Sequence, residues 1–163
     1  MPITSKKDFY TKKNFYSLYL LLNKNDNTFF VGYCYSDNIK NNYKNHYIGY
    51  FNKTKTWIEE MKMNNQRPCI FVLENLFVTK SKAYKHLIVW TKIISEKKYL
   101  NIENNNTSVY AKDLYDENLE LYKELKEINF NEIISCKNCI LPKYKNQFCQ
   151  FYEAEVKENG KGN

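Results

Sequence analysis

Two short apolar runs, separated by five polar residues, constrain the fold of this chain more than any other feature. The first run covers residues 15–22 (FYSLYLLL) and the second covers 28–33 (TFFVGY). The link between them, NKNDN, contains Asn and Asp, which tolerate the left-handed backbone of tight turns. Two such runs joined this closely predict an antiparallel hairpin with strands at about 15–22 and 28–35.

A third apolar run and several helical patterns follow the hairpin. Residues 69–73 (CIFVL) are apolar throughout, which predicts a buried central strand. Apolar spacing predicts a short helix after Asp37, a helix over 55–63, a helix over 82–95 capped by Ser81, and an amphipathic helix from Asp113 to about residue 128. The expected fold is therefore an α/β domain with the element order β-β-α-α-β-α, followed by a C-terminal helical extension.

The length of 163 residues suits one domain with appendages. We expect a basic flexible arm at 1–14, the α/β domain at 15–104, a helical, cysteine-bearing extension at 105–152 and a disordered tail at 153–163. No apolar run is long enough to span a bilayer, and the polar, lysine-rich start does not resemble a signal peptide. These features predict a cytoplasmic protein that does not contact a membrane.

The charge of the chain is distributed unevenly. The basic residues are 24 Lys and Arg67, and Asn is abundant, which is typical of drift under an A+T-rich genome. Drift does not explain the distribution: residues 1–104 hold 17 basic and 8 acidic residues, a net of +9, whereas residues 105–163 hold 8 and 10, a net of −2. A basic first part predicts a polyanionic partner such as nucleic acid.

Two triplets in the hairpin carry a family resemblance. Tyr19 ends a Ser-Leu-Tyr triplet in the first strand, and Phe30 opens a Phe-Val-Gly triplet that ends at Gly32 in the second. This pair resembles the hairpin strands of the GIY-YIG nucleases, and the resemblance covers about residues 15–104. The resemblance implies a small α/β sandwich with a mainly antiparallel three-stranded sheet, and it favours DNA over RNA as the partner. It implies the family's phosphodiester hydrolysis, which needs an activated water, a divalent metal such as Mg²⁺ and a cation near the transition state.

The resemblance assigns roles to individual residues. Tyr19 matches the first catalytic tyrosine and Gly32 the small residue that lets substrate approach, whereas Phe30 replaces the second tyrosine without its hydroxyl. On the first helix, His46 matches a catalytic position of the family. A surface histidine without a catalytic role is an equally good interpretation of this residue. Asn42, with Lys40 nearby, stands where the family has arginine. Asn101 matches a late asparagine of the family.

The metal-binding glutamate of the family has no counterpart at the matching position. The spacing from Ala83 and from Trp90 leads to Leu87, next to His86, which could bind a transition metal. No carboxylate occurs between Glu74 and Glu96. The resemblance therefore implies a domain that has lost its metal ligand.

These observations predict a nucleic-acid-binding protein on a catalytically degenerate nuclease-like domain, with an origin in a phage or another mobile element. Tyr19, His46 and Asn101 would be vestiges of the catalytic site. The residues expected to contact nucleic acid are Gly32, Tyr33, Tyr35, Lys40, Tyr43, Lys44, Lys53 and Lys55.

Two other functions stay open. The first is an active metal-dependent DNA endonuclease in which another carboxylate, Glu74 first, replaces the missing ligand. The second is a protein-interaction role, as an inhibitor of a nucleic-acid enzyme or a ribonucleoprotein subunit, through the acidic helix near 113–129.

The C-terminal cysteines form a candidate zinc site. Cys136 and Cys139 are spaced as C-x-x-C, and Cys149 follows ten residues later. Structural zinc takes four ligands, so the fourth would come from Cys34, Cys69 or a partner. Reduced cysteines in an apolar lobe are the alternative.

Overall fold

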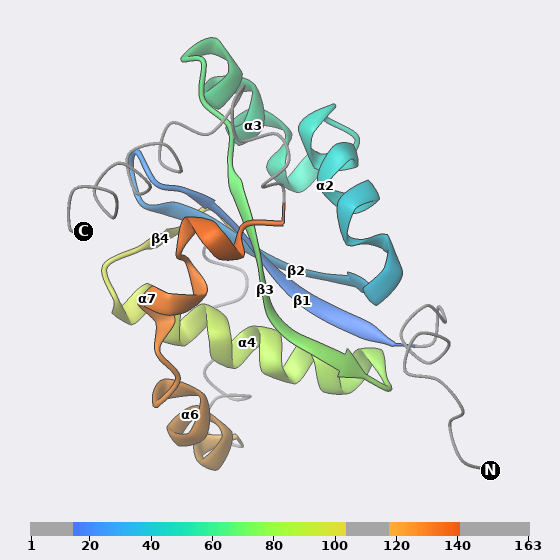
Figure 1. Ribbon diagram of the computed structural model, residues 1–163, viewed down its shortest axis with the longest axis vertical. Helices are drawn as coiled ribbons and strands as arrows, with labels where there is room; N and C mark the ends of the chain where they lie inside the picture. The colour runs from blue at the N-terminus through green and yellow to red at the C-terminus, as the bar shows by residue number, and fades with distance from the viewer. Residues whose placement is uncertain (1–14, 104–117, 141–163) are drawn as a thin grey trace.

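A computed structural model describes residues 15–103 and 118–140 of the chain (Figure 1). It is a mixed α/β structure around one four-stranded, mostly antiparallel sheet in the order β3-β1-β2-β4. The elements are β1 (Tyr16–Asn23), β2 (Thr28–Tyr35), η1 (Ser36–Asn38), α2 (Ile39–Tyr47), α3 (Asn52–Met63), β3 (Cys69–Phe77), α4 (Lys80–Glu96), β4 (Leu100–Asn101), α6 (Leu119–Lys126), α7 (Phe130–Ile133) and η2 (Cys136–Asn138).

The predicted hairpin is confirmed. β1 and β2 pair in unbroken antiparallel register from Tyr16 opposite Tyr35 to Asn23 opposite Thr28. Asn27 takes the left-handed conformation with φ 60°, and its N–H donates to the Asn23 carbonyl at 2.9 Å. The Asn-rich link therefore makes the turn that its composition predicts.

The third strand is buried as expected, but the prediction of a central position is wrong. β3 pairs with β1 alone among the described strands, so β1 is central and β3 lies at the end of the sheet. Its outer edge is partly covered, because the Ile140 N–H donates to the Ile70 carbonyl at 3.0 Å. A continuous apolar run indicates that helices cover both faces of a strand, which does not fix its place in the sheet.

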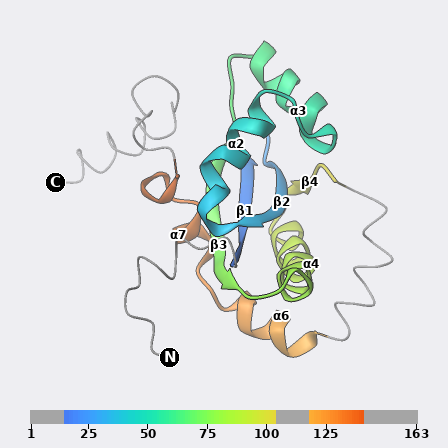
Figure 2. The same cartoon turned by 90° about the vertical axis from the view of Figure 1, so that its right-hand side faces the viewer.

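A fourth strand, which the sequence pattern does not predict, extends the sheet. β4 pairs in parallel with the start of β2, with Leu100 opposite Thr28 and Asn101 opposite Phe29 (Figure 2). Two residues are too few to show the alternation of a strand. The short β4 covers only one end of the outer edge of β2.

Two hydrophobic cores lie on the two faces of the sheet. On one face Leu18, Leu20 and Leu22 pack with α4 residues, and the core continues into α6 and α7. On the other face Tyr19 and Leu21 pack with residues of β2, α2 and β3. Figure 1 shows α2 and α3 on one side of the sheet and α4, α6 and α7 on the other. Successive side chains of β1 point to opposite faces of the sheet, so this strand contributes residues to both cores.

The helices agree with the sequence prediction in place but differ at their ends. α4 begins two residues earlier than expected, because Thr79 rather than Ser81 caps it: the Thr79 hydroxyl accepts from the Lys82 N–H at 3.1 Å. Only the end of the helix predicted over 113–128 falls within the described residues, as α6, whose Tyr122 and Leu125 are buried. Within the described ranges, no helix has the length and apolar character needed to cross a membrane.

Candidate functional site: a cleft at the outer edge of β2

A cleft of about 410 Å³ opens beside β2, where the pairing with β4 has ended. Its walls come from elements on both faces of the sheet. They include Tyr19, Phe30 and Gly32 from the hairpin, Asn42 and His46 from α2, and Leu87 from α4. The positions that the family resemblance singles out in the hairpin and in both helices therefore meet in one cavity.

Gly32 allows the ring of Tyr19 to lie across β2. The two residues are opposite each other in the hairpin register. A Cβ atom built on Gly32 would lie 2.6 Å from Cζ of Tyr19, far inside van der Waals contact, and 2.9 Å from the Phe30 ring. The absence of a side chain at Gly32 is therefore what makes room for the tyrosine in the cleft wall.

A chain of hydrogen bonds runs from Tyr19 through His46 to α3. The Tyr19 hydroxyl and His46 Nε2 are 2.7 Å apart, and His46 Nδ1 lies 2.7 Å from Thr54 Oγ1. All three side chains are buried. Burial lowers the pKa of His46 to about 4 and raises the pKa of Tyr19 above its usual value. At neutral pH both groups are uncharged, and His46 is a core residue with a defined polar role, not a surface histidine.

An ion pair that sequence reasoning did not connect lies at the rim of the cleft. Lys53 Nζ is 2.8 Å from Glu103 Oε1, and both residues line the cleft. The hydrogen bond to Glu103 raises the pKa of Lys53. Asn101 does not line the cleft, but its Oδ1 accepts from the Glu103 N–H at 3.0 Å and so shapes the turn that carries Glu103. No sequence signal links Lys53 to Glu103, because their contact depends on the position of β4.

Asn42 contributes a polar side chain to the wall of the cleft. Its Oδ1 is buried and has no hydrogen-bond partner among the described residues. A buried carbonyl oxygen without a donor costs free energy. Asn42 is therefore a cleft residue with an oxygen that no described group satisfies.

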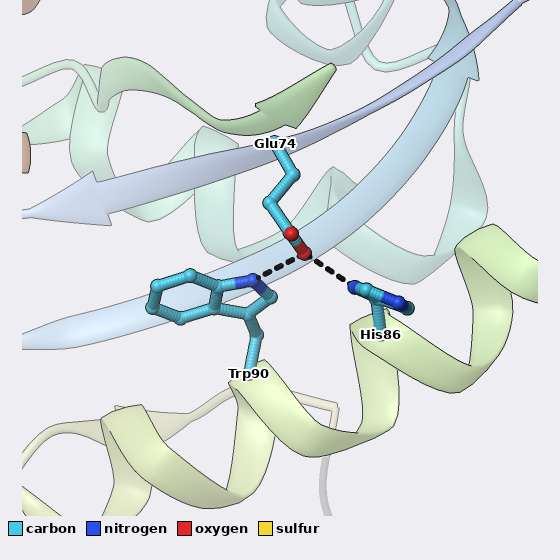
Figure 3. Close-up of polar contacts among 3 residues, drawn as sticks. All are labelled: Glu74, His86 and Trp90. Atoms are coloured by element: carbon cyan, nitrogen blue, oxygen red, sulfur yellow. Dashed lines mark hydrogen bonds and ion pairs between the residues drawn. The ribbon is translucent and has the colours of Figure 1, made fainter. Parts of the chain in front are cut away.

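Glu74, the expected replacement for the missing metal ligand, does not line the cleft. Register shifts in β3 turn its side chain toward α4, as a β-bulge does. There its Oε2 lies 2.7 Å from His86 Nδ1 and accepts from Trp90 Nε1 at 2.9 Å (Figure 3). Both polar groups proposed as stand-in ligands, Glu74 and His86, are thus bonded to each other on the α4 side of the sheet.

The residues predicted to contact nucleic acid fall into two groups. Tyr33 and Tyr35 are 37% and 39% exposed, and the four lysines are exposed: Lys40, Lys44, Lys53 and Lys55. Tyr43 is only 4% exposed, and its hydroxyl donates to the Pro68 carbonyl at 2.8 Å. The prediction for Tyr43 is therefore wrong: its spacing with Ile39 and His46 places it on the buried face of α2.

The zinc prediction stays a prediction. Cys136 is buried, with its Sγ 3.4 Å from Lys24 Nζ, and Cys139 is half-buried, while Cys149 lies outside the described residues. Cys34 and Cys69 belong to the cores on opposite faces of the sheet. Within 15–103 and 118–140, no group of three or more His, Cys, Asp or Glu residues is placed to hold a metal ion.

Comparisons of the chain with protein-family models, with curated proteins and with solved structures found no match. The chemistry of the cleft therefore has to follow from its own residues.

Proposed function

We propose that this chain binds nucleic acid through the cleft beside β2, as a GIY-YIG-like domain that no longer cleaves it. One observation carries the proposal. Residues matched to the family's catalytic positions, from Tyr19 in β1 to Leu87 in α4, line the same cavity although they are far apart in the sequence. An alignment with the wrong register would have no reason to bring these positions together.

The side chains in the cleft favour binding over hydrolysis. Leu87 offers no oxygen to a divalent ion at the position of the family's carboxylate. Asn42 carries no charge to offset the developing charge on a phosphate. Burial raises the pKa of Tyr19, so its hydroxyl stays protonated at neutral pH and little tyrosinate is present to act as a base.

The three helices that contribute residues to the cleft also carry exposed lysines. They are Lys40 and Lys44 on α2, Lys53 and Lys55 on α3, and Lys82 and Lys85 on α4. Lysines at this density attract the phosphates of nucleic acid over a distance of about 10 Å at moderate salt. The phosphate backbone would therefore supply most of the affinity, and the affinity would depend strongly on salt.

Binding is tested by measuring affinity for a short DNA as a function of salt. We expect log K to fall linearly with log salt, with a slope of about 0.9 for each phosphate contacted. The double charge reversal Lys40→Glu with Lys44→Glu should weaken binding and flatten the slope, as should Lys53→Glu with Lys55→Glu. The matched reversal Lys123→Glu with Lys126→Glu on α6 should do neither. Absence of binding at low salt would refute the proposal.

Cleavage is tested separately with plasmid, branched and single-stranded DNA in Mg²⁺ or Mn²⁺. We expect no metal-dependent product from the native chain. Leu87→Glu alone should restore little, because the cation of the family's arginine is still missing at Asn42. Nicking by the native chain that Tyr19→Phe abolishes would show that the site is catalytically competent.

A second candidate, an active metal-dependent nuclease, is favoured by one observation. Among the described residues that line the cleft, Glu103 carries the one carboxylate, and it shares the cavity with Tyr19 and His46. Against it stands the Lys53 ammonium at 2.8 Å, which competes with a metal ion. In this case cleavage would be lost in Glu103→Gln and kept in Glu74→Gln, whose carboxylate lies on the α4 side of the sheet.

A further inference from the structure

We infer that the nucleic acid bound here is single-stranded, with one unstacked base in the cleft and the next bases stacked on a row of tyrosines. This inference rests on the proposed function and names its substrate class. The row, called here the tyrosine platform, consists of Tyr16, Tyr33 and Tyr35. Tyr33 also lines the cleft, so platform and cleft form one continuous surface.

The tyrosine platform is an exposed aromatic surface at the open end of the hairpin. Tyr16 lies opposite Tyr35 in the register, and their rings stack at 4.9 Å with 23° between planes. Tyr16 also meets the edge of Tyr33 at 6.2 Å and 69°. More than a third of the surface of Tyr33 and of Tyr35 is open to solvent, whereas Tyr16 supports them from a half-buried position against the core. Exposed aromatic rings on a sheet stack well on unpaired bases of any sequence.

The spacing of the platform favours a single strand. Tyr33 and Tyr35 are two residues apart on β2, so their backbones are roughly 6.6 Å apart along the strand. Stacked bases within one strand of a duplex are separated by about 3.4 Å. Successive bases can therefore lie on the two tyrosines only when they are unstacked from each other, which a single strand allows and a duplex resists.

The cleft suits one uncharged, planar group. Its walls are largely aromatic and aliphatic, with Phe30, Phe51, Tyr84 and Leu87 among them. Asn42 adds an amide to this lining, a group that can pair with the ring N–H or amino group of a base. Lys53 at the rim is 70% exposed and can reach a phosphate of the same strand. A bare phosphate inside the cleft would instead meet apolar walls and the Glu103 carboxylate.

A duplex could fill this cleft only by extruding a base. That step costs a few kcal/mol for a paired base and little for a base that is already unpaired. The same surface thus discriminates between the two forms of nucleic acid without reading sequence.

The experiment compares four probes by calorimetry at moderate salt: a DNA strand of about 12 nucleotides, the RNA of the same sequence, the DNA duplex, and an abasic strand with the same number of phosphates. We expect the DNA strand, the RNA strand or both to bind at least about tenfold more tightly than the duplex and the abasic strand. Which of the two binds better identifies the natural sugar, and either result supports the inference.

Variants of the platform separate stacking from charge. Tyr33→Ala and Tyr35→Ala should each weaken binding of the strand with bases by about fivefold or more and leave the abasic strand unaffected. Tyr33→Phe and Tyr35→Phe keep the ring and should bind as the native chain does. Asn42→Ala should weaken binding only when bases are present. Circular dichroism of each variant checks that the sheet is intact.

The outcomes separate this inference from the proposed function. Salt-dependent binding that is equal for duplex, abasic and normal strands would overturn the inference and leave the proposed function standing. A preference for single strands that survives both alanine variants would also overturn it. If no probe binds even at low salt, the proposed function fails and the inference fails with it.

Discussion

At the scale of single residues, the contact between Gly32 and Tyr19 sets the shape of the cleft. Gly32→Ala would place a methyl group 2.6 Å from the Tyr19 ring, and the backbone of β2 on one side and the buried ring on the other leave little room to adjust. We expect a loss of about 1–3 kcal/mol in the free energy of unfolding, measured in urea. In a Tyr19→Ala background the same substitution should cost much less. Equal costs in both backgrounds would show that the ring is not the obstacle.

His46 makes stability depend on pH. Its folded pKa of about 4 lies below the ordinary value near 6.5, so between these values the unfolded chain binds more protons. The contribution is therefore intact above pH 6.5 and is lost as the pH falls toward 4, by up to roughly 3 kcal/mol. Urea unfolding between pH 7.5 and 4 measures it.

The chain has two histidines, so His86→Gln leaves His46 as the one imidazole. Its NMR signal should then titrate near 4. A midpoint near 6.5 would contradict the buried hydrogen-bonded state.

Sequence reasoning located His46 but could not decide its role. The two readings differ in whether the ring is buried, and burial depends on Thr54 and Phe51, which follow the helix at no regular spacing. The Lys53–Glu103 pair was missed for a similar reason, since it joins two elements that touch only through the fold. Tyr19 and Gly32 were found because adjacent strands of a hairpin have a register that a sequence can reveal.

At the scale of elements, the start of α4 can be tested with a matched pair. Thr79→Ala removes the hydroxyl that accepts from the Lys82 N–H and should cost about 1 kcal/mol. Ser81→Ala changes an exposed position inside the helix and should cost less than about half of that. Thermal unfolding of the two variants gives the comparison. A larger loss of stability for Ser81→Ala than for Thr79→Ala would instead identify Ser81 as the N-cap, as the sequence predicted.

The edge of β3 can be tested at Ile140. Cys139 before it has the extended backbone that proline requires of its predecessor, and proline at position 140 removes the N–H that donates to Ile70. Ile140→Pro should lower stability by about 1 kcal/mol more than Ile140→Ala, which keeps the N–H and loses the same side-chain packing. It should also increase self-association in light scattering, because an open strand edge pairs with other chains. Equal stability and equal self-association of the two variants would show that the Ile140 N–H does not protect the edge of β3.

The sequence predicted the type of most described elements but not how they connect in space. Apolar periodicity reports which faces are buried, so β1, β2, α2, α3 and α4 were found with small errors at their ends, whereas the four-residue α7 was not predicted. It does not report strand order, and β3 was wrongly placed in the centre. β4 has two residues and no pattern at all, although it closes one end of the β2 edge and thereby sets where the cleft begins.

At the scale of the whole molecule, β1 joins the two cores. Leu20 and Leu21 are adjacent and fully buried, one facing each core. Leu20→Ala and Leu21→Ala should each cost about 2–5 kcal/mol and shift one common unfolding transition. Far-ultraviolet circular dichroism and calorimetry should give the same midpoint for each variant. Two separated transitions would show that the faces unfold independently.

The two tryptophans of the chain lie on opposite sides of the sheet. Trp57 on α3 donates its indole N–H to Thr28 Oγ1 at 2.9 Å, while Trp90 on α4 donates to the Glu74 carboxylate at the same distance. One indole therefore emits beside a neutral hydroxyl and the other beside an acidic group. With either replaced by phenylalanine, the remaining fluorophore reports on one layer alone, so the protein carries an intrinsic optical probe for each half of its interior.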